Sequence, residues 1–176
     1  MNLLMTLQKE LKNLKNINLI EIKINDIVFE DKVKLSCFYC SKYNTKWTCP
    51  PKIPQLDYKN LVKEFENAVI IYTKMDFTKE NYEEIRHLSS VVVHKTILKA
   101  EKILLENGES LFVSFVGGSC KLCKNGCSPD KCRNPGLARI PMEATGINVI
   151  KTVSKYGIDI KFPVSTSLYR IGLILF

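Results

Sequence analysis

Apolar residues recur at helical spacing near the start of the chain and then alternate with polar ones. Four leucines lie three or four positions apart between residues 4 and 14, which predicts an amphipathic helix over about residues 2–16. Isoleucines alternate with polar residues over 20–24, as in a half-buried strand. After a turn, residues 27–29 and 33–35 are predicted to continue as extended structure.

Two short and continuous apolar runs predict strands that are covered on both faces. They span residues 68–72 and 111–116 and are rich in β-branched and aromatic side chains. Between them the pattern predicts the longest helix, over about 79–106, with Thr78 as a candidate N-cap. Asn107-Gly108 is the expected stop of this helix.

The other segments complete an alternation of helices and strands. Asp57 is a plausible N-cap for a short helix, and a further helix is expected over 147–156, with Gly157 as its stop. Residues 168–176 are predicted to form a final strand. Alternating elements predict the α/β class, as a single domain over residues 1–176 with a small central sheet of three or four strands flanked by helices.

Four cysteines fall within thirteen residues, directly after the run that ends at residue 116. The run reads C-x2-C-x3-C-x4-C, with glycine and proline between the sulfurs: Cys120, Cys123, Cys127 and Cys132. Crowded thiolates repel one another unless a metal shares their charge, and soft thiolates select iron–sulfur clusters or zinc. Structural zinc sites usually pair two separated knuckles, whereas ferredoxins wrap a cluster with a compact run that resembles this one. The run therefore predicts a metal centre, with a [4Fe–4S] cluster favoured and zinc as the alternative.

A second cysteine group lies in the aperiodic segment 37–54, a predicted loop. Cys37 and Cys40 form a C-x2-C knuckle, and Cys49 follows nine residues later. Three cysteines are one short of a closed site. The group could hold a second cluster with an open position, share Cys132 with the main group, or consist of reduced thiols beside one centre. We favour a second metal-binding group.

Three other features lie on or near these cysteines. Trp47 precedes Cys49 by two positions, where it could exclude water from a metal centre or simply pack in the core. Gly117-Gly118 lacks a nucleotide-binding context and is expected to let the backbone approach the centre closely. His87 and His94 are seven positions apart on the predicted long helix, too far for one metal, so surface or core roles are favoured.

Composition limits the classes of function. The chain has 176 residues, is 45% hydrophobic and 25% charged, and carries a formal net charge of +8 that bound thiolates would lower. No dense basic block occurs, so nucleic-acid binding is not expected, and no apolar run approaches the ~20 residues that span a bilayer. Without a visible secretion signal, a cytoplasmic location is expected, where clustered thiols favour metal over disulfides.

The cysteine segments resemble those of DUF2284, a family described as predicted metal-binding proteins. The resemblance covers most of the chain from about residue 30 and rests on the segments 37–51, 118–135 and 138–149. The family has an Arg-Pro-Ser-Met-Glu-Ala-like stretch after its cysteines, and here Arg139-Ile-Pro-Met-Glu143-Ala has the proline one place later. The resemblance implies metal binding and marks Arg139 as a candidate to stabilise an anionic cluster, although an ion pair with Glu143 is an equal alternative.

These observations support three hypotheses about function. The first is an iron–sulfur protein that transfers electrons, with a redox partner protein. The second is an enzyme whose Cys37/Cys40/Cys49 centre activates a substrate at an open metal position. The third is a structural zinc module that presents a binding surface. The sequence does not choose between enzyme and non-enzyme, and it leaves the oligomeric state open.

Overall fold

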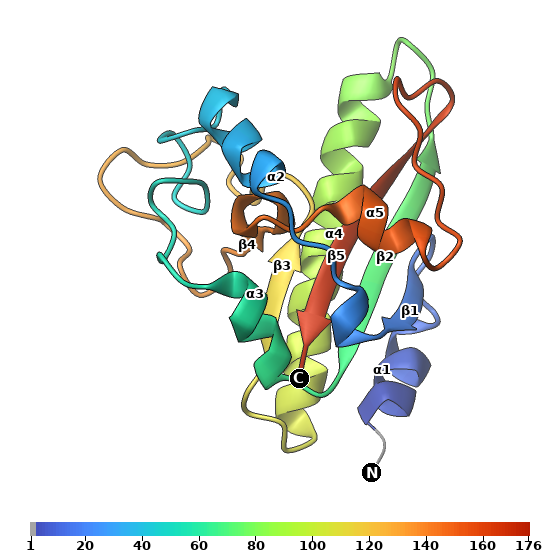
Figure 1. Ribbon diagram of the computed structural model, residues 1–176. Coiled ribbons are helices and arrows are strands. Elements are labelled where there is room, and N and C mark those ends of the chain that lie inside the picture. The colour runs from blue at the N-terminus through green and yellow to red at the C-terminus, as the bar shows by residue number, and fades with distance from the viewer. Residues whose placement is uncertain (1–2) are drawn as a thin grey trace.

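The computed structural model describes residues 3–176, which form one five-stranded sheet with helices on both faces (Figure 1). The strand order is β1-β2-β5-β3-β4. The strands are β1 (Asn18–Ile22), β2 (Ala68–Asp76), β3 (Val113–Val116), β4 (Ile140–Pro141) and β5 (Ser167–Leu175). The predicted α/β class is confirmed. The sheet has more strands than expected because the two-residue β4 has no sequence pattern of its own.

The sheet is mixed, with the C-terminal strand at its centre. β5 pairs antiparallel with β2 on one side, where Ala68 lies opposite Leu175, and antiparallel with β3 on the other. β1 extends the sheet beyond β2 as an antiparallel edge strand. β3 and β4 form the one parallel pair among the described strands. The chain therefore returns to the β3 edge after a long excursion, and this excursion contains the main cysteine run.

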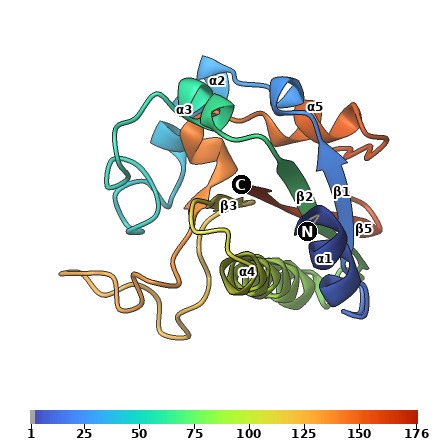
Figure 2. The same cartoon turned by 90° about the horizontal axis from the view of Figure 1, so that it is seen from below.

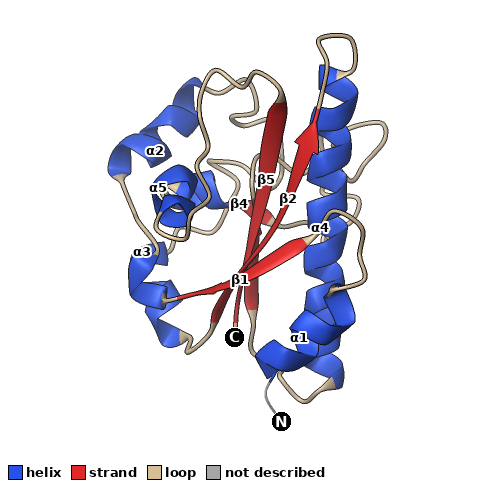
Figure 3. Ribbon diagram, turned by 90° about the vertical axis from the view of Figure 1, so that its right-hand side faces the viewer, coloured by secondary structure: helices blue, strands red, loops and turns tan. Residues whose placement is uncertain are grey.

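Two layers of helices cover the sheet. Figures 2 and 3 show α1 (Leu3–Leu11) and α4 (Tyr82–Glu106) on one face. On the other face lie three short helices, α2 (Asp31–Ser36), α3 (Tyr58–Leu61) and α5 (Val149–Ser154). No helix in residues 3–176 is long and apolar enough to cross a membrane.

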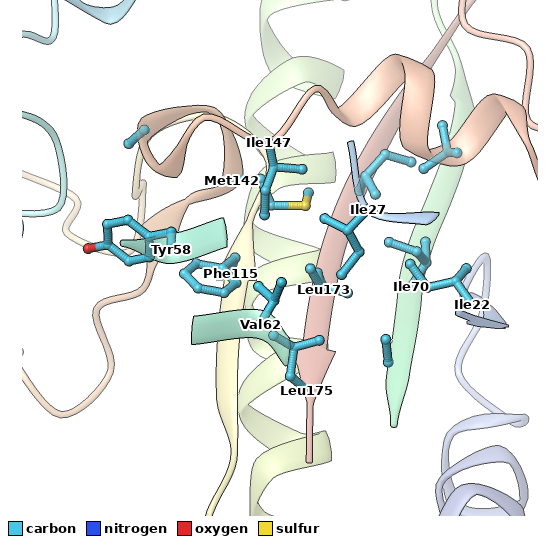
Figure 4. Packing of buried hydrophobic residues seen from close by; sticks show 14 of the residues in the cluster. Ile22, Ile27, Tyr58, Val62, Ile70, Phe115, Met142, Ile147, Leu173 and Leu175 are labelled. Carbon is cyan, nitrogen blue, oxygen red and sulfur yellow. The ribbon is translucent and has the colours of Figure 1, made fainter. Parts of the chain in front are cut away.

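The two faces of the sheet bury separate apolar clusters. Successive residues of a strand point to opposite faces, so Leu173 joins the cluster under the short helices while Ile174 joins the one under α4. In the first cluster Tyr58 packs edge-on against Phe115, with ring centroids 6.1 Å apart (Figure 4). This cluster also contains Met142, directly after β4, so the apolar core fixes the segment that follows the cysteines.

Several predicted boundaries are confirmed by local hydrogen bonds. Asp57 caps α3, because its Oδ1 accepts from the backbone N–H of Asn60 at 3.0 Å. Asn107 ends α4, and Gly108 follows with a φ of +90°. The final strand runs over Ser167–Leu175, close to the predicted 168–176.

Other predictions are wrong in an instructive way. Residues 33–35 are helical within α2, not extended, because the sheet offers this segment no partner strand and Leu35 stays 59% exposed. Thr78 does not cap α4, which begins at Tyr82. The backbone N–H of Thr78 donates to the side chain of Asn81 instead. The first helix ends at Leu11, not residue 16, and residue 2 lies outside the described residues.

Candidate metal centre and adjoining cavity

The two cysteine groups lie in neighbouring loops beyond the β3 and β4 edge of the sheet (Figures 1 and 2). We call residues 37–54 the first cysteine loop and residues 117–139 the second cysteine loop. The second loop starts where β3 ends, as the position of ligand sites in α/β sheets predicts, and it finishes at β4. The sheet therefore holds both ends of the loop that carries four thiols.

The entry to the second loop is fixed by a glycine. A Cβ on Gly117 would lie 2.6 Å from the carbonyl oxygen of Ile171 in β5, so no larger residue fits there without displacing the strand. Gly118 follows with a φ of +75°, and its N–H donates to Glu143 Oε2 at 3.1 Å. The backbone at this pair approaches β5 closely, and its predicted approach to a metal centre stays a prediction.

The exit from the second loop is fixed by a largely buried ion pair. The guanidinium of Arg139 donates to both carboxylate oxygens of Glu101 on α4 and to Ser114 on β3. It also donates to the carbonyls of Gly136 and Ala138 within the loop. The predicted alternative of an ion pair with Glu143 is wrong, since Glu101 is the partner. A direct contact between Arg139 and a bound cluster stays a prediction.

The four thiols of the second loop are half-buried and near one another. Burial raises the pKa of Cys120, and the neighbouring thiols of the other three cysteines raise it further. Asn134 donates through Nδ2 to the Sγ of Cys123 at 3.3 Å. Across residues 3–176, however, no three side chains of His, Cys, Asp or Glu converge closely enough to hold a metal ion. The fold gathers the predicted ligands in one loop without closing them around one point.

The first loop also groups its cysteines. Cys49 is only 7% exposed, and burial together with the neighbouring Cys37 and Cys40 raises its pKa to about 11. Burial likewise raises the pKa of Cys37, and the next contributions come from Glu143 and Cys40. Glu143 therefore lies near the first group while it accepts a hydrogen bond at the entry of the second loop. Sequence reasoning had placed this carboxylate only beside Arg139.

A cavity of about 580 Å³ lies between the two loops. All three cysteines of the first loop line it, together with Cys123, so Cys123 and not Cys132 is the second loop's sulfur at this cavity. The remaining wall includes Arg86 and His87 of α4 and Glu143. The role of α4 had no sequence signal, since a single arginine on a helix is an ordinary surface residue.

Two cationic side chains meet at one backbone carbonyl of α4 beside this cavity. Lys121 Nζ and Arg170 Nη2 both donate to the carbonyl oxygen of Arg86, at 3.3 and 3.5 Å. Burial, together with the neighbouring charges of Arg170 and Arg86, lowers the pKa of Lys121 to about 8. Arg170 also donates to the carbonyl of Gly117 at 3.3 Å, and its buried Nε has no hydrogen-bond partner among the described residues.

Trp47 links the two loops. Its indole Nε1 donates to the carbonyl oxygen of Ser128 at 2.8 Å, and Lys52 Nζ lies 4.2 Å from the ring centroid. The ring belongs to neither buried apolar cluster, so the alternative of a core tryptophan is wrong. Whether it also shields a metal centre stays a prediction.

The two histidines take different places. His94 is 2% exposed, and its Nε2 lies 2.8 Å from the carbonyl oxygen of Leu137, which matches the predicted core role. Burial lowers its pKa. His87 is exposed and lines the same cavity as Cys37 and Cys40. The helix thus holds one histidine inside the fold and presents the other to the cysteine loops.

Comparison with known proteins adds one finding. The profile of a protein family described as "Predicted metal-binding protein (DUF2284)" matches residues 20–176, nearly the whole chain. No curated protein and no solved structure matches the chain.

Proposed function

The chain belongs to the DUF2284 family of predicted metal-binding proteins, and from this premise we propose that its second cysteine loop binds an iron–sulfur cluster for electron transfer. Cys120, Cys123, Cys127 and Cys132 would hold the cluster. The observation that carries the proposal is the grouping of these four thiols, in which each of the other three raises the pKa of Cys120. Such a set is stable as thiolates only with a metal that shares the charge.

The donor set fits a thiophilic metal, because sulfur ligands select iron–sulfur clusters or zinc over hard cations. Bound iron–sulfur clusters supply a one-electron redox centre. Between Cys120 and Cys132 the described residues contain one backbone–backbone hydrogen bond, from Gly126 N to the Cys123 carbonyl. The loop therefore has few bonds to break when its four sulfurs draw together.

Residues around the loop would position it and tune it. Asn134 donates to the sulfur of Cys123, and hydrogen bonds to ligand sulfurs adjust the reduction potential of a cluster. Arg139 and Glu101 hold the exit of the loop on α4. The formal net charge of +8 favours an acidic redox partner. The chemistry requires a compartment that keeps thiols reduced, such as the cytoplasm.

Metal analysis tests the proposal directly. The protein is purified without oxygen, and iron, acid-labile sulfide and zinc are measured per chain, together with the visible absorption spectrum. We expect a brown protein with iron and sulfide in equal amounts. A colourless protein with stoichiometric zinc, even after anaerobic reconstitution with iron and sulfide, would support the structural zinc module and exclude the cluster.

A second candidate function is favoured by the cavity. Cys37, Cys40 and Cys49 line it with Cys123, which would give a metal held by the first loop an open face toward a substrate. In that case Cys37→Ser should leave the metal content of the second loop unchanged and should reduce total metal by the share of the first loop. If Cys37→Ser leaves total metal unchanged, the first loop contains reduced thiols only.

A further inference from the structure

We propose that the cavity between the two cysteine loops binds a small anionic molecule through its phosphate or carboxylate oxygens. This inference goes beyond metal binding and stands on the residues of the cavity itself. The site is built from four separate parts of the chain: the two cysteine loops, the first turns of α4, and the segment 141–144 after the second loop.

The lining has a strong excess of positive charge. Five cationic side chains line the cavity, and Glu143 is the one carboxylate among the described residues that do so. The cations are Lys42, Lys46, Arg86, Lys121 and Lys124. Five cations against one carboxylate give the wall a formal excess of four positive charges before any thiolate charge is counted. Walls of one sign focus the field in a cleft and attract ligands of the opposite sign.

Arg86 is the only guanidinium among these five cations. Its backbone carbonyl accepts from Lys121 and Arg170, which holds this turn of α4 against the entry of the second loop. Its guanidinium donates to Glu83 through Nη1 at 3.1 Å, and Glu83 is 77% exposed. A guanidinium has five N–H donors in a fork that matches phosphate and carboxylate groups, so Arg86 retains donors for a ligand.

The size and surroundings of the cavity fit a metabolite-sized anion. A volume of about 580 Å³ lies within the ~300–1,000 Å³ range of small-molecule sites. Lys42 and Lys46 approach from the first loop and Lys121 from the second, so an anion between them would neutralise charges from both loops. A ligand in this position would also lie beside the sulfurs of Cys37, Cys40 and Cys49.

A competing explanation is that the cations only offset the negative charge of ligating thiolates. The two explanations differ at Arg86, which is not part of either cysteine loop. If Arg86 only offsets the charge of the thiolates, then Arg86→Gln reduces metal retention without changing the affinity for the anion. If it binds a ligand, then Arg86→Gln weakens anion binding while the metal content stays the same.

Isothermal titration of the anaerobically purified protein tests the proposal, with its bound metal retained and quantified before and after. The probes are glycerol 3-phosphate for a phosphate group, succinate for a carboxylate group and glycerol as the uncharged control. We expect at least one anion to bind and glycerol not to bind. Arg86→Gln should lower the affinity for the anion about tenfold, because charge-assisted hydrogen bonds are lost. Arg86→Lys should restore part of this affinity.

Lys95→Gln is the matched control, because Lys95 is an exposed residue of the same helix, does not line the cavity, and its replacement removes the same charge. The Lys95→Gln variant should bind the anion with the same affinity as the unaltered protein. Lys42→Gln, in the first loop, is a second test and should also lower the affinity for the anion. The proposal is overturned if neither anion binds, if Lys95→Gln weakens binding as much as Arg86→Gln, or if Arg86→Gln loses metal but keeps its anion affinity. Metal loss and anion loss are measured separately, so the failure of this proposal is distinguishable from the failure of the cluster proposal.

Discussion

The two cysteine loops differ in how they are held. The first loop is built from turns: Asn44 N donates to the Pro50 carbonyl at 2.8 Å, and Cys49 N to the Lys46 carbonyl at 3.1 Å. It buries Cys49 almost completely. The second loop has one backbone–backbone hydrogen bond between its four cysteines in the described structure. It is held at its two ends and by the hydrogen bond from Trp47 to Ser128.

This difference indicates two ways to prepare a thiol site. The first loop places its thiols through its own backbone, and burial stabilises the neutral thiols of Cys37 and Cys49 by raising their pKa. The second loop keeps four half-buried thiols together by anchoring the chain before and after them. We therefore expect the second loop to depend on metal for its internal order and the first loop to depend on it less.

The largest expected effect is on metal content. Cys120→Ser should remove most of the metal of the second loop, a loss of affinity greater than the ~10–100-fold typical of changes around the ligands. Cys40→Ser should retain that metal, because Cys40 is an exposed residue of the first loop. Metal analysis of the two variants after identical anaerobic purification makes the comparison. Equal losses in both variants would mean that the loops form one shared site.

The next largest effect is expected at the exit of the second loop. Arg139→Gln leaves the Glu101 carboxylate, with a side chain 8% exposed, without its cation and should lower the free energy of unfolding by about 3–5 kcal/mol. Urea denaturation monitored by circular dichroism measures this. The double variant Arg139→Gln/Glu101→Gln should recover part of the loss, because the uncompensated charge is removed. A loss below about 0.5 kcal/mol would contradict the anchoring role.

The entry of the second loop is expected to be somewhat less sensitive. Gly117→Ala places a Cβ against the Ile171 carbonyl and should cost about 1–3 kcal/mol of unfolding free energy. Gly136→Ala is the matched control in the same loop, since an added Cβ there meets no atom within 4 Å. Thermal unfolding of both variants tests this. If both lower the melting temperature equally, the contact with β5 is not the cause.

A smaller effect is expected at the link between the loops. Trp47→Phe keeps an aromatic ring but removes the hydrogen bond to the Ser128 carbonyl, which should cost about 1 kcal/mol. The second loop should then be cleaved faster in limited proteolysis, while the first loop is unchanged. Tyr39→Phe serves as the control, because Tyr39 is a 78% exposed aromatic residue of the first loop.

The smallest effect is expected at an anchor of the first loop and depends on pH. Hydrogen bonds from Lys151 and Asn148 lower the pKa of Glu30, which precedes α2, to about 2. A pKa lowered by folding gives stability that is present at neutral pH and is lost as the pH falls from about 4.5 toward 2. Glu30→Gln should therefore melt at a lower temperature than the unaltered protein at pH 7. This gap should narrow at pH 3, and an unchanged gap would show that the carboxylate charge is not involved.

Local signals in the sequence predicted much of the scaffold. The cap at Asp57, the stop at Asn107-Gly108 and the buried strand at 68–72 each depend on residues next to one another, so the sequence carries them directly. Thr78 and the segment 33–35 were predicted wrongly, because their states depend on which partners the rest of the fold supplies.

The cysteine spacing by itself predicted metal binding, since crowded thiols favour a thiophilic metal, and the chain matches a family of predicted metal-binding proteins. Only the tertiary structure decided what surrounds those thiols. Arg139 is joined to Glu101 across 38 residues, Trp47 to Ser128 across 81, and Arg170 lies beside Arg86 across 84. Such contacts follow from how α4, the sheet and the two cysteine loops pack against one another. They leave no periodic pattern in the chain, so the sequence alone does not reveal them.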